Sequence, residues 1–109
     1  MAKAYTLGTY RVLPGKEAEF IAAWNRLAAT LSLLADPPYW GTLLRSTTDP
    51  TLFHSFGPWE SGSAVTAMRK DPIAQAAFES IAALCSDMTP GNYEVVAHIA
   101  VRDEPRSRG

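Results

Sequence analysis

The sequence predicts an α+β protein of the ferredoxin-like class, in which two helices cover one face of an antiparallel sheet in the order βαββαβ. Segments rich in aromatic and β-branched residues alternate with segments in which apolar residues recur at helical spacing. Prolines and glycines separate these segments and mark where each element ends.

Residues 4–13 (AYTLGTYRVL) end at Pro14-Gly15, which predicts a strand followed by a turn. Residues 16–35 open with acidic residues, which favour a helix N-terminus, and then carry one apolar stripe. The stripe consists of Phe20, Trp24, Leu27, Leu31 and Leu34. A helix is therefore predicted over 16–35, and Asp36-Pro37-Pro38 ends it because proline lacks the N–H that a helix needs to continue.

The next two segments, 39–48 and 51–57, are strand-like and are joined across Asp49-Pro50, a spacing that predicts a hairpin. Ser61 has the side chain of a helix N-cap and predicts a short helix that runs to about Lys70.

A second helical segment restarts at Asp71-Pro72, with Asp as the N-cap and Pro at the first helical position. Its apolar face is predicted to consist of Ile73, Ala77, Ile81, Leu84 and Met88, and Cys85 inside it is interpreted as a buried, unreactive thiol. Pro90-Gly91 is predicted to end this helix, and residues 93–101 (YEVVAHIAV) to form the last strand.

The composition fits one globular domain, because the 109 residues include 47% hydrophobic and 19% charged residues. The domain is predicted over 1–103, with a flexible charged tail over 104–109. A net charge of −1 without a basic stripe argues against a nucleic-acid partner. No apolar run is long enough for a membrane span, and the N-terminus lacks a signal-peptide pattern. A single cysteine favours a reducing compartment, so we expect a cytoplasmic protein.

Adjacent apolar residues in the predicted strands indicate that both faces of the sheet carry apolar side chains. The pairs are Leu43-Leu44, Leu52-Phe53 and Val95-Val96. Two helices can cover only one face, and a second copy of the same sheet is the simplest cover for the other. The sequence therefore predicts a homodimer.

The chain resembles the antibiotic biosynthesis monooxygenase family of dimeric α+β barrels in three stretches. These are PGKEAEFIAAW, STTDPTLFHSFGPWESGSA and the broken helix at Lys70-Asp71-Pro72. The resemblance covers about residues 4–101. It implies a monooxygenase that needs no cofactor and oxidises a small aromatic molecule, such as a quinol or an anthrone, with O₂. The alternative is a non-catalytic dimeric module that binds a small apolar molecule or serves as a structural partner.

Relatives of this family that degrade haem carry an Asn in the first strand and a Trp and a His around the broken helix. Gly8, Ala67 and Ala77 or Phe78 stand at those places here, so the resemblance argues against haem degradation. The polyketide oxidisers use Trp, Asn and Tyr side chains in the cavity, for which Trp24 and Asn25 are the nearest counterparts.

His54 is the candidate catalytic residue, because an imidazole can accept a proton near neutral pH. A core histidine bonded to a neighbouring hydroxyl or carbonyl is the alternative. Trp24, Asn25 and Arg45 are the candidate substrate-binding residues; Trp24 also fits an ordinary core position and Arg45 an ordinary salt bridge. Arg11 is interpreted as a salt-bridge partner at the sheet rim, and His98 as a dimer-interface residue on the last strand. The two histidines and one cysteine do not form a recognisable metal site.

Overall fold

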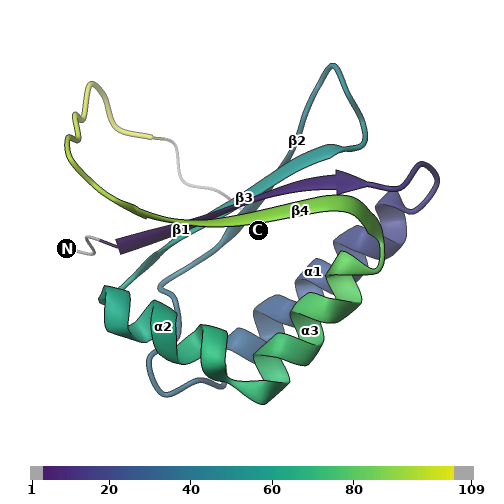
Figure 1. Ribbon diagram of the computed structural model, residues 1–109. Coiled ribbons are helices and arrows are strands. Elements are labelled where there is room, and N and C mark those ends of the chain that lie inside the picture. The colour runs from purple at the N-terminus through teal and green to yellow at the C-terminus, as the bar shows by residue number, and fades with distance from the viewer. Residues whose placement is uncertain (1–3, 105–109) are drawn as a thin grey trace.

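The structure, a computed structural model, describes residues 4–104 and confirms the ferredoxin-like class. Its elements are β1 (Ala4–Val12), α1 (Glu17–Leu31), β2 (Thr42–Arg45), β3 (Leu52–Trp59), α2 (Gly62–Lys70), α3 (Pro72–Ala82) and β4 (Cys85–Glu94). The strands form one antiparallel sheet in the order β2-β3-β1-β4, and the helices lie on one face of it (Figure 1). Apart from Glu104, the tail predicted over 104–109 lies outside the described residues.

The main core lies where α1 and α3 pack on β1 and β3. Phe20 of α1 is fully buried, and its ring lies 5.0 Å from that of Tyr10 and 4.8 Å from that of Phe53, measured between centroids. A second cluster forms around Trp59, which ends β3 and is 2% exposed. Trp59 thus anchors the packing between β3 and the helix that follows it.

Side-chain caps begin α2 and α3 at the predicted places. The hydroxyl of Ser61 accepts a hydrogen bond from the N–H of Ala64, and the carboxylate of Asp71 accepts from the N–H groups of Ile73 and Ala74. These bonds satisfy N–H groups that have no partner inside the helix. Both predicted N-caps are confirmed.

The predicted end of the second helix was wrong, because α3 stops at Ala82 and Cys85 already begins β4. A register shift opposite Arg11 and Val12 pairs Cys85 with Val12 and Met88 with Tyr10, so both point to the core. This bulge puts two residues three apart on the same face of a strand, which imitates helical spacing in the sequence. Pro90 fits within β4 because an edge strand can direct the nitrogen of proline away from the sheet.

The strand predicted over 93–101 was also wrong, since β4 ends at Glu94. The chain after it has no regular structure up to residue 104 and curves away from the helices (Figure 1). His98 therefore lies outside the sheet. Val96, Ile99 and Val101 in this segment are at least 79% exposed.

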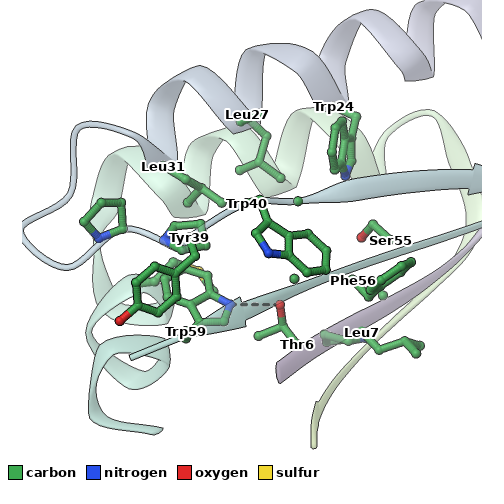
Figure 2. Close-up of a pocket in the computed structure, with 18 of the residues that line it drawn as sticks. Thr6, Leu7, Trp24, Leu27, Leu31, Tyr39, Trp40, Ser55, Phe56 and Trp59 are labelled. Carbon is green, nitrogen blue, oxygen red and sulfur yellow. Dashed lines mark hydrogen bonds between the residues drawn. The ribbon is translucent and has the colours of Figure 1, made fainter. Parts of the chain in front are cut away.

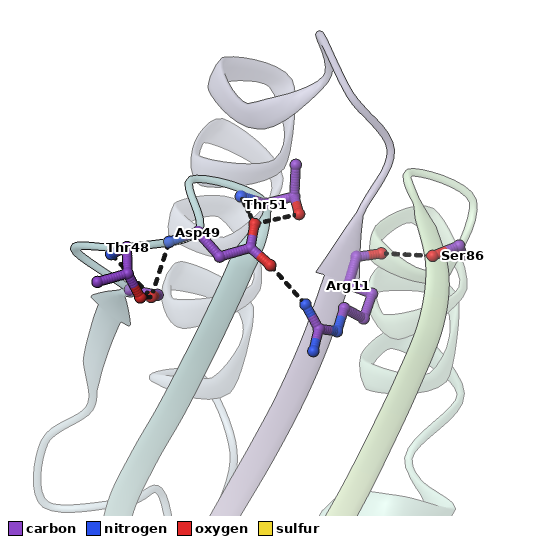
Figure 3. A network of polar contacts seen from close by, with 6 residues as sticks. Arg11, Thr48, Asp49, Thr51 and Ser86 are labelled. Carbon is purple, nitrogen blue, oxygen red and sulfur yellow. Dashed lines mark hydrogen bonds and ion pairs between the residues drawn. The ribbon is translucent and has the colours of Figure 1, made fainter.

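The turn between β2 and β3 is fixed by Asp49, as Figure 3 shows. Its carboxylate accepts hydrogen bonds from the N–H and the hydroxyl of Thr51, and forms an ion pair with the guanidinium of Arg11 at 2.6 Å. These partners, Thr51 first and Arg11 next, hold the pKa of Asp49 below its usual value. Arg11 is thus a salt-bridge residue at the sheet rim, as predicted.

The face of the sheet opposite the helices, here called the open face, carries every second residue of each strand. Its larger side chains include Tyr5, Leu7, Leu44, Leu52, His54, Phe56 and Tyr93. Within residues 4–104 no helix has the length and hydropathy of a membrane span.

Candidate functional site

A cavity of about 370 Å³, here called the main cavity, lies between the helices and the sheet, at the end of the sheet where α1 finishes. Its walls come from α1, from residues 37–41 after that helix, and from α2 and α3, as Figure 2 shows in part. The wall side chains include Trp24, Leu27, Leu31, Tyr39, Trp40, Trp59, Met68 and Phe78. The volume and the apolar walls are typical of a small-molecule site.

Small residues on the strands leave this space empty. Thr6 and Gly8 of β1 pair with Gly57 and Ser55 of β3, and all four lie on the helix side of the sheet and line the main cavity. At the other end of the same strands, the large Tyr10 and other buried side chains fill the corresponding space. Small residues at one end of β1 and β3 and large residues at the other therefore divide this side of the sheet into a hollow site and a packed core.

Three lining residues, Thr6, Ser55 and Trp59, place polar groups at the floor of the main cavity. The hydroxyl of Ser55 lies 2.7 Å from that of Tyr10, and the indole N–H of Trp59 donates to the hydroxyl of Thr6 at 3.0 Å. Burial raises the pKa of Tyr10, against smaller lowering effects from Ser55 and Trp24. The Tyr10 hydroxyl therefore stays protonated near neutral pH.

Arg69 at the end of α2 is the only charged side chain that lines the main cavity within the described chain. The residue is partly buried, and its guanidinium donates to the side-chain oxygen of Asn92 at 2.7 Å. The lining contains no carboxylate, so the charge of Arg69 favours a ligand in its anionic form.

The rim of the main cavity is aromatic and exposed. Trp40 meets the rings of Tyr5 and Phe56 edge to face, at centroid distances of 6.3 and 5.7 Å. Tyr39 donates a hydrogen bond to the carboxylate of Glu60, which raises the pKa of this tyrosine. These contacts tie the loop over residues 37–41 to the sheet edge.

A second pocket of about 430 Å³ opens beside the first, between α1 and β2. It is lined by Ile21, Trp24, Asn25, Leu43, Arg45 and Phe53. The structure thus brings the three predicted substrate-binding residues together at one pocket, and Trp24 lines the main cavity as well.

His54 lies apart from both cavities. It is on the open face, near the start of the inner strand β3, partly buried, and its Nδ1 is 3.1 Å from the hydroxyl of Thr9 on β1. The lining of neither cavity includes it. A catalytic role for His54 stays a prediction.

Sequence reasoning missed Ser55, Tyr10 and Arg69 as site residues. The sequence did contain a pattern that indicates the floor of the main cavity. Two strands rich in aromatic residues carry small residues at alternate positions, Thr6 and Gly8 in one and Ser55 and Gly57 in the other. Arg69 gave no signal, because its place depends on how α2 packs. Within residues 4–104, no group of three His, Cys, Asp or Glu side chains is arranged to hold a metal ion.

Comparison with known families identifies one that the chain matches. The model of the antibiotic biosynthesis monooxygenase family matches residues 4–80, which is more than half of the chain. The chain belongs to this family. No curated protein sequence matches it closely enough to add a relative.

Several solved structures have the same fold. A single-site variant of SnoaB from Streptomyces nogalater, a cofactor-independent oxygenase, matches with a TM-score of 0.79 at 18% identity, over 94% of this chain and all of that one. A protein assigned to the antibiotic biosynthesis monooxygenases from Deinococcus radiodurans gives 0.78 at 16% identity, over 92% and 99% of the two chains. Another protein assigned to this family, from Caulobacter crescentus, matches with a TM-score of 0.76 at 20% identity, over 88% of this chain and 92% of that one. At these identities the likeness concerns the fold.

Proposed function

We propose that this member of the antibiotic biosynthesis monooxygenase family is a cofactor-independent monooxygenase that oxidises a small quinol- or anthrone-like aromatic with O₂ in the main cavity. The observation that carries the proposal is a hollow with aromatic and apolar walls whose lining includes one cation, Arg69. Such a site accepts flat aromatic rings and favours the anion that reacts with O₂.

The first step is loss of a proton from the substrate to solvent, which leaves a phenolate or enolate. Arg69 stabilises the negative oxygen by charge, and the Ser55 hydroxyl, held by Tyr10, donates a hydrogen bond to it. Both groups bind the anion more tightly than the neutral substrate, so they lower the pKa of the bound substrate.

The anion then gives one electron to O₂, and the resulting radical and superoxide combine to form a carbon–oxygen bond. The peroxide takes up a proton and eliminates water with the second hydrogen of the same carbon. For an anthrone CH₂ the product is a carbonyl: one oxygen atom enters it and the other leaves as water. The substrate supplies all four electrons, so the reaction needs no external reductant.

Oxygen uptake by the metal-free protein with a panel of anthrones and quinols tests the proposal. We expect uptake by the wild type and at least a tenfold lower rate for Arg69→Met. Arg26→Met is the matched control, because Arg26 is exposed on α1 and lines neither cavity. Absence of uptake across the panel, with all proteins folded, would contradict the proposal.

The alternative is a binding module without turnover. It is favoured by the lining of the main cavity, which contains no imidazole or carboxylate within residues 4–104 to act as a base. Tight binding of aromatic ligands in the main cavity together with flat oxygen traces is the outcome expected for this alternative.

We also propose that the protein is a homodimer formed through the open face. Leu44 on this face is 49% exposed and Tyr93 is 57% exposed, and the chain after β4 adds exposed apolar side chains. Covering these groups is favourable by the hydrophobic effect. Sedimentation at micromolar concentration should give the mass of two chains, and Leu44→Lys should shift it toward one; a single-chain mass for the wild type would contradict the dimer.

A further inference from the structure

The second pocket combines a cation with an amide and apolar walls. Arg45 on β2 extends its guanidinium over the ring of Phe53, with the central carbon 5.1 Å from the ring centroid. Asn25 and Trp24 face it from α1. The ion pairs found among residues 4–104 are Arg11 with Asp49 and Lys16 with Glu19, so Arg45 is free of a carboxylate partner there.

This combination of groups fits a carboxylate. A guanidinium presents parallel N–H groups that match the two oxygens of a carboxylate, and the cation–π contact with Phe53 helps to hold the Arg45 side chain over the pocket. The amide of Asn25 provides a further donor at the same pocket. Leu43 and Ile21 provide apolar contacts for the carbon atoms that carry the acid.

Trp24 connects this pocket to the main cavity, because its side chain lines both. Its ring lies against the backbone at Gly41, where a β-carbon would be 3.6 Å away, so residues 37–41 hold it in place. A ligand whose rings lie in the main cavity can therefore extend an arm past Trp24 toward Arg45.

We propose that the second pocket binds a carboxylate on the aromatic substrate whose rings occupy the main cavity, with Arg45 as the residue that selects for the acid. This inference rests on the proposed function for its substrate and names the class: aromatic carboxylic acids. Arg45 is a specificity-determining residue, and it does not touch the reacting carbon.

Binding of two already oxidised probes tests the inference without turnover. The probes are anthraquinone-2-carboxylate and its neutral analogue 2-methylanthraquinone, followed by calorimetry and by tryptophan fluorescence. We expect the acid to bind wild-type protein at least tenfold more tightly than the neutral probe. Arg45→Met should remove this preference and leave the affinity for the neutral probe within twofold, whereas Arg26→Met should retain the preference.

Competition between the probes tests whether one molecule spans both sites. The acid should bind once per chain and displace the neutral probe. Equal affinities for the two probes in the wild type, a preference that survives Arg45→Met, or acid binding that does not displace the neutral probe would each overturn the inference. Circular dichroism and thermal melting establish that each variant is folded.

Oxygen uptake distinguishes failure of this inference from failure of the proposed function. Turnover without a preference for the acid overturns the carboxylate site alone. A preference for the acid without turnover of any acidic or neutral anthrone overturns the monooxygenase and supports the site as part of a binding module.

Discussion

The hydroxyl of Tyr10 lies 2.7 Å from that of Ser55, and this bond joins the buried core to the floor of the main cavity. Tyr10 is 3% exposed, whereas Ser55 lines the cavity. The bond requires a glycine at position 8, because a β-carbon there would stand 2.5 Å from the Tyr10 hydroxyl oxygen. The same three residues thus shape the hollow and fix a hydrogen-bond donor inside it.

Removing Ser55 alone should destabilise the protein more than removing both hydroxyls. Ser55→Ala leaves the buried Tyr10 hydroxyl without its partner, which costs about 1–3 kcal/mol in the free energy of unfolding. The double variant Ser55→Ala with Tyr10→Phe leaves no unpaired group and should recover part of this loss. Urea denaturation measures the free energy of unfolding of the two single variants and of the double variant. A loss in the double variant equal to the sum of the two single losses would contradict the prediction.

Stability should fall in the alkaline range through Tyr10. Burial raises its pKa above the ordinary value of 10.0, so the folded state favours the protonated hydroxyl. This contribution is fully present below pH about 10, where the unfolded tyrosine is also protonated, and is lost as pH rises through the raised folded pKa. Urea midpoints should drop less over this pH range in Tyr10→Phe than in the wild type. Identical dependence of the midpoint on pH in the two proteins would rule out Tyr10 as the source of the alkaline loss.

Gly57→Ala should disturb the rim of the main cavity. A β-carbon at Gly57 would overlap the main-chain carbonyl oxygen of Trp40, which cannot yield without moving the loop. We expect a loss of about 1–3 kcal/mol in stability, typical of overpacking, together with weaker binding of aromatic probes. Gly62→Ala is the control, because open space surrounds a β-carbon there; equal effects of the two substitutions would contradict the prediction.

The cap at Asp71 should contribute measurably to the broken helix. Its Oδ1 accepts from the N–H groups of Ile73 and Ala74, each at 2.9 Å. Asp71→Ala should lower the free energy of unfolding by about 1 kcal/mol, and Asp71→Asn by less, because the amide oxygen still caps. Thermal melting of both variants beside Asp36→Ala, an exposed loop substitution, checks this; no difference between Ala and Asn at position 71 would count against the cap.

His54→Ala separates the two roles considered for this histidine. A catalytic base requires at least a tenfold loss of oxygen uptake. Its position on the open face, bonded to Thr9 and outside both cavity linings, instead predicts uptake within about twofold of the wild type and a weaker dimer. Oxygen uptake and sedimentation measured on the same preparation distinguish the catalytic role from the role in the dimer. Loss of oxygen uptake in an intact dimer would support the catalytic role.

Local chemistry explains which elements could be predicted from the sequence. The apolar stripe from Phe20 to Leu31, the caps Ser61 and Asp71, and the hairpin at Asp49 depend on residues a few positions apart, and each was found in place. The helix predicted over 16–35 ends earlier, at Leu31, so Leu34 lies outside it. The last strand was misplaced because a bulge gave Cys85 and Met88 helical spacing, and a bulge depends on the partner strand.

The sequence by itself determined the fold class, the strand–helix boundaries up to α2 to within a few residues, and the family, because these follow from periodicity, capping and a recognisable pattern. Only the tertiary structure decided which side of the sheet each strand residue faces. It placed His54 on the open face, assembled Trp24, Asn25 and Arg45 at one pocket, and brought Arg69 into the main cavity. Register and helix packing set these positions, and both arise from contacts between residues far apart in the chain.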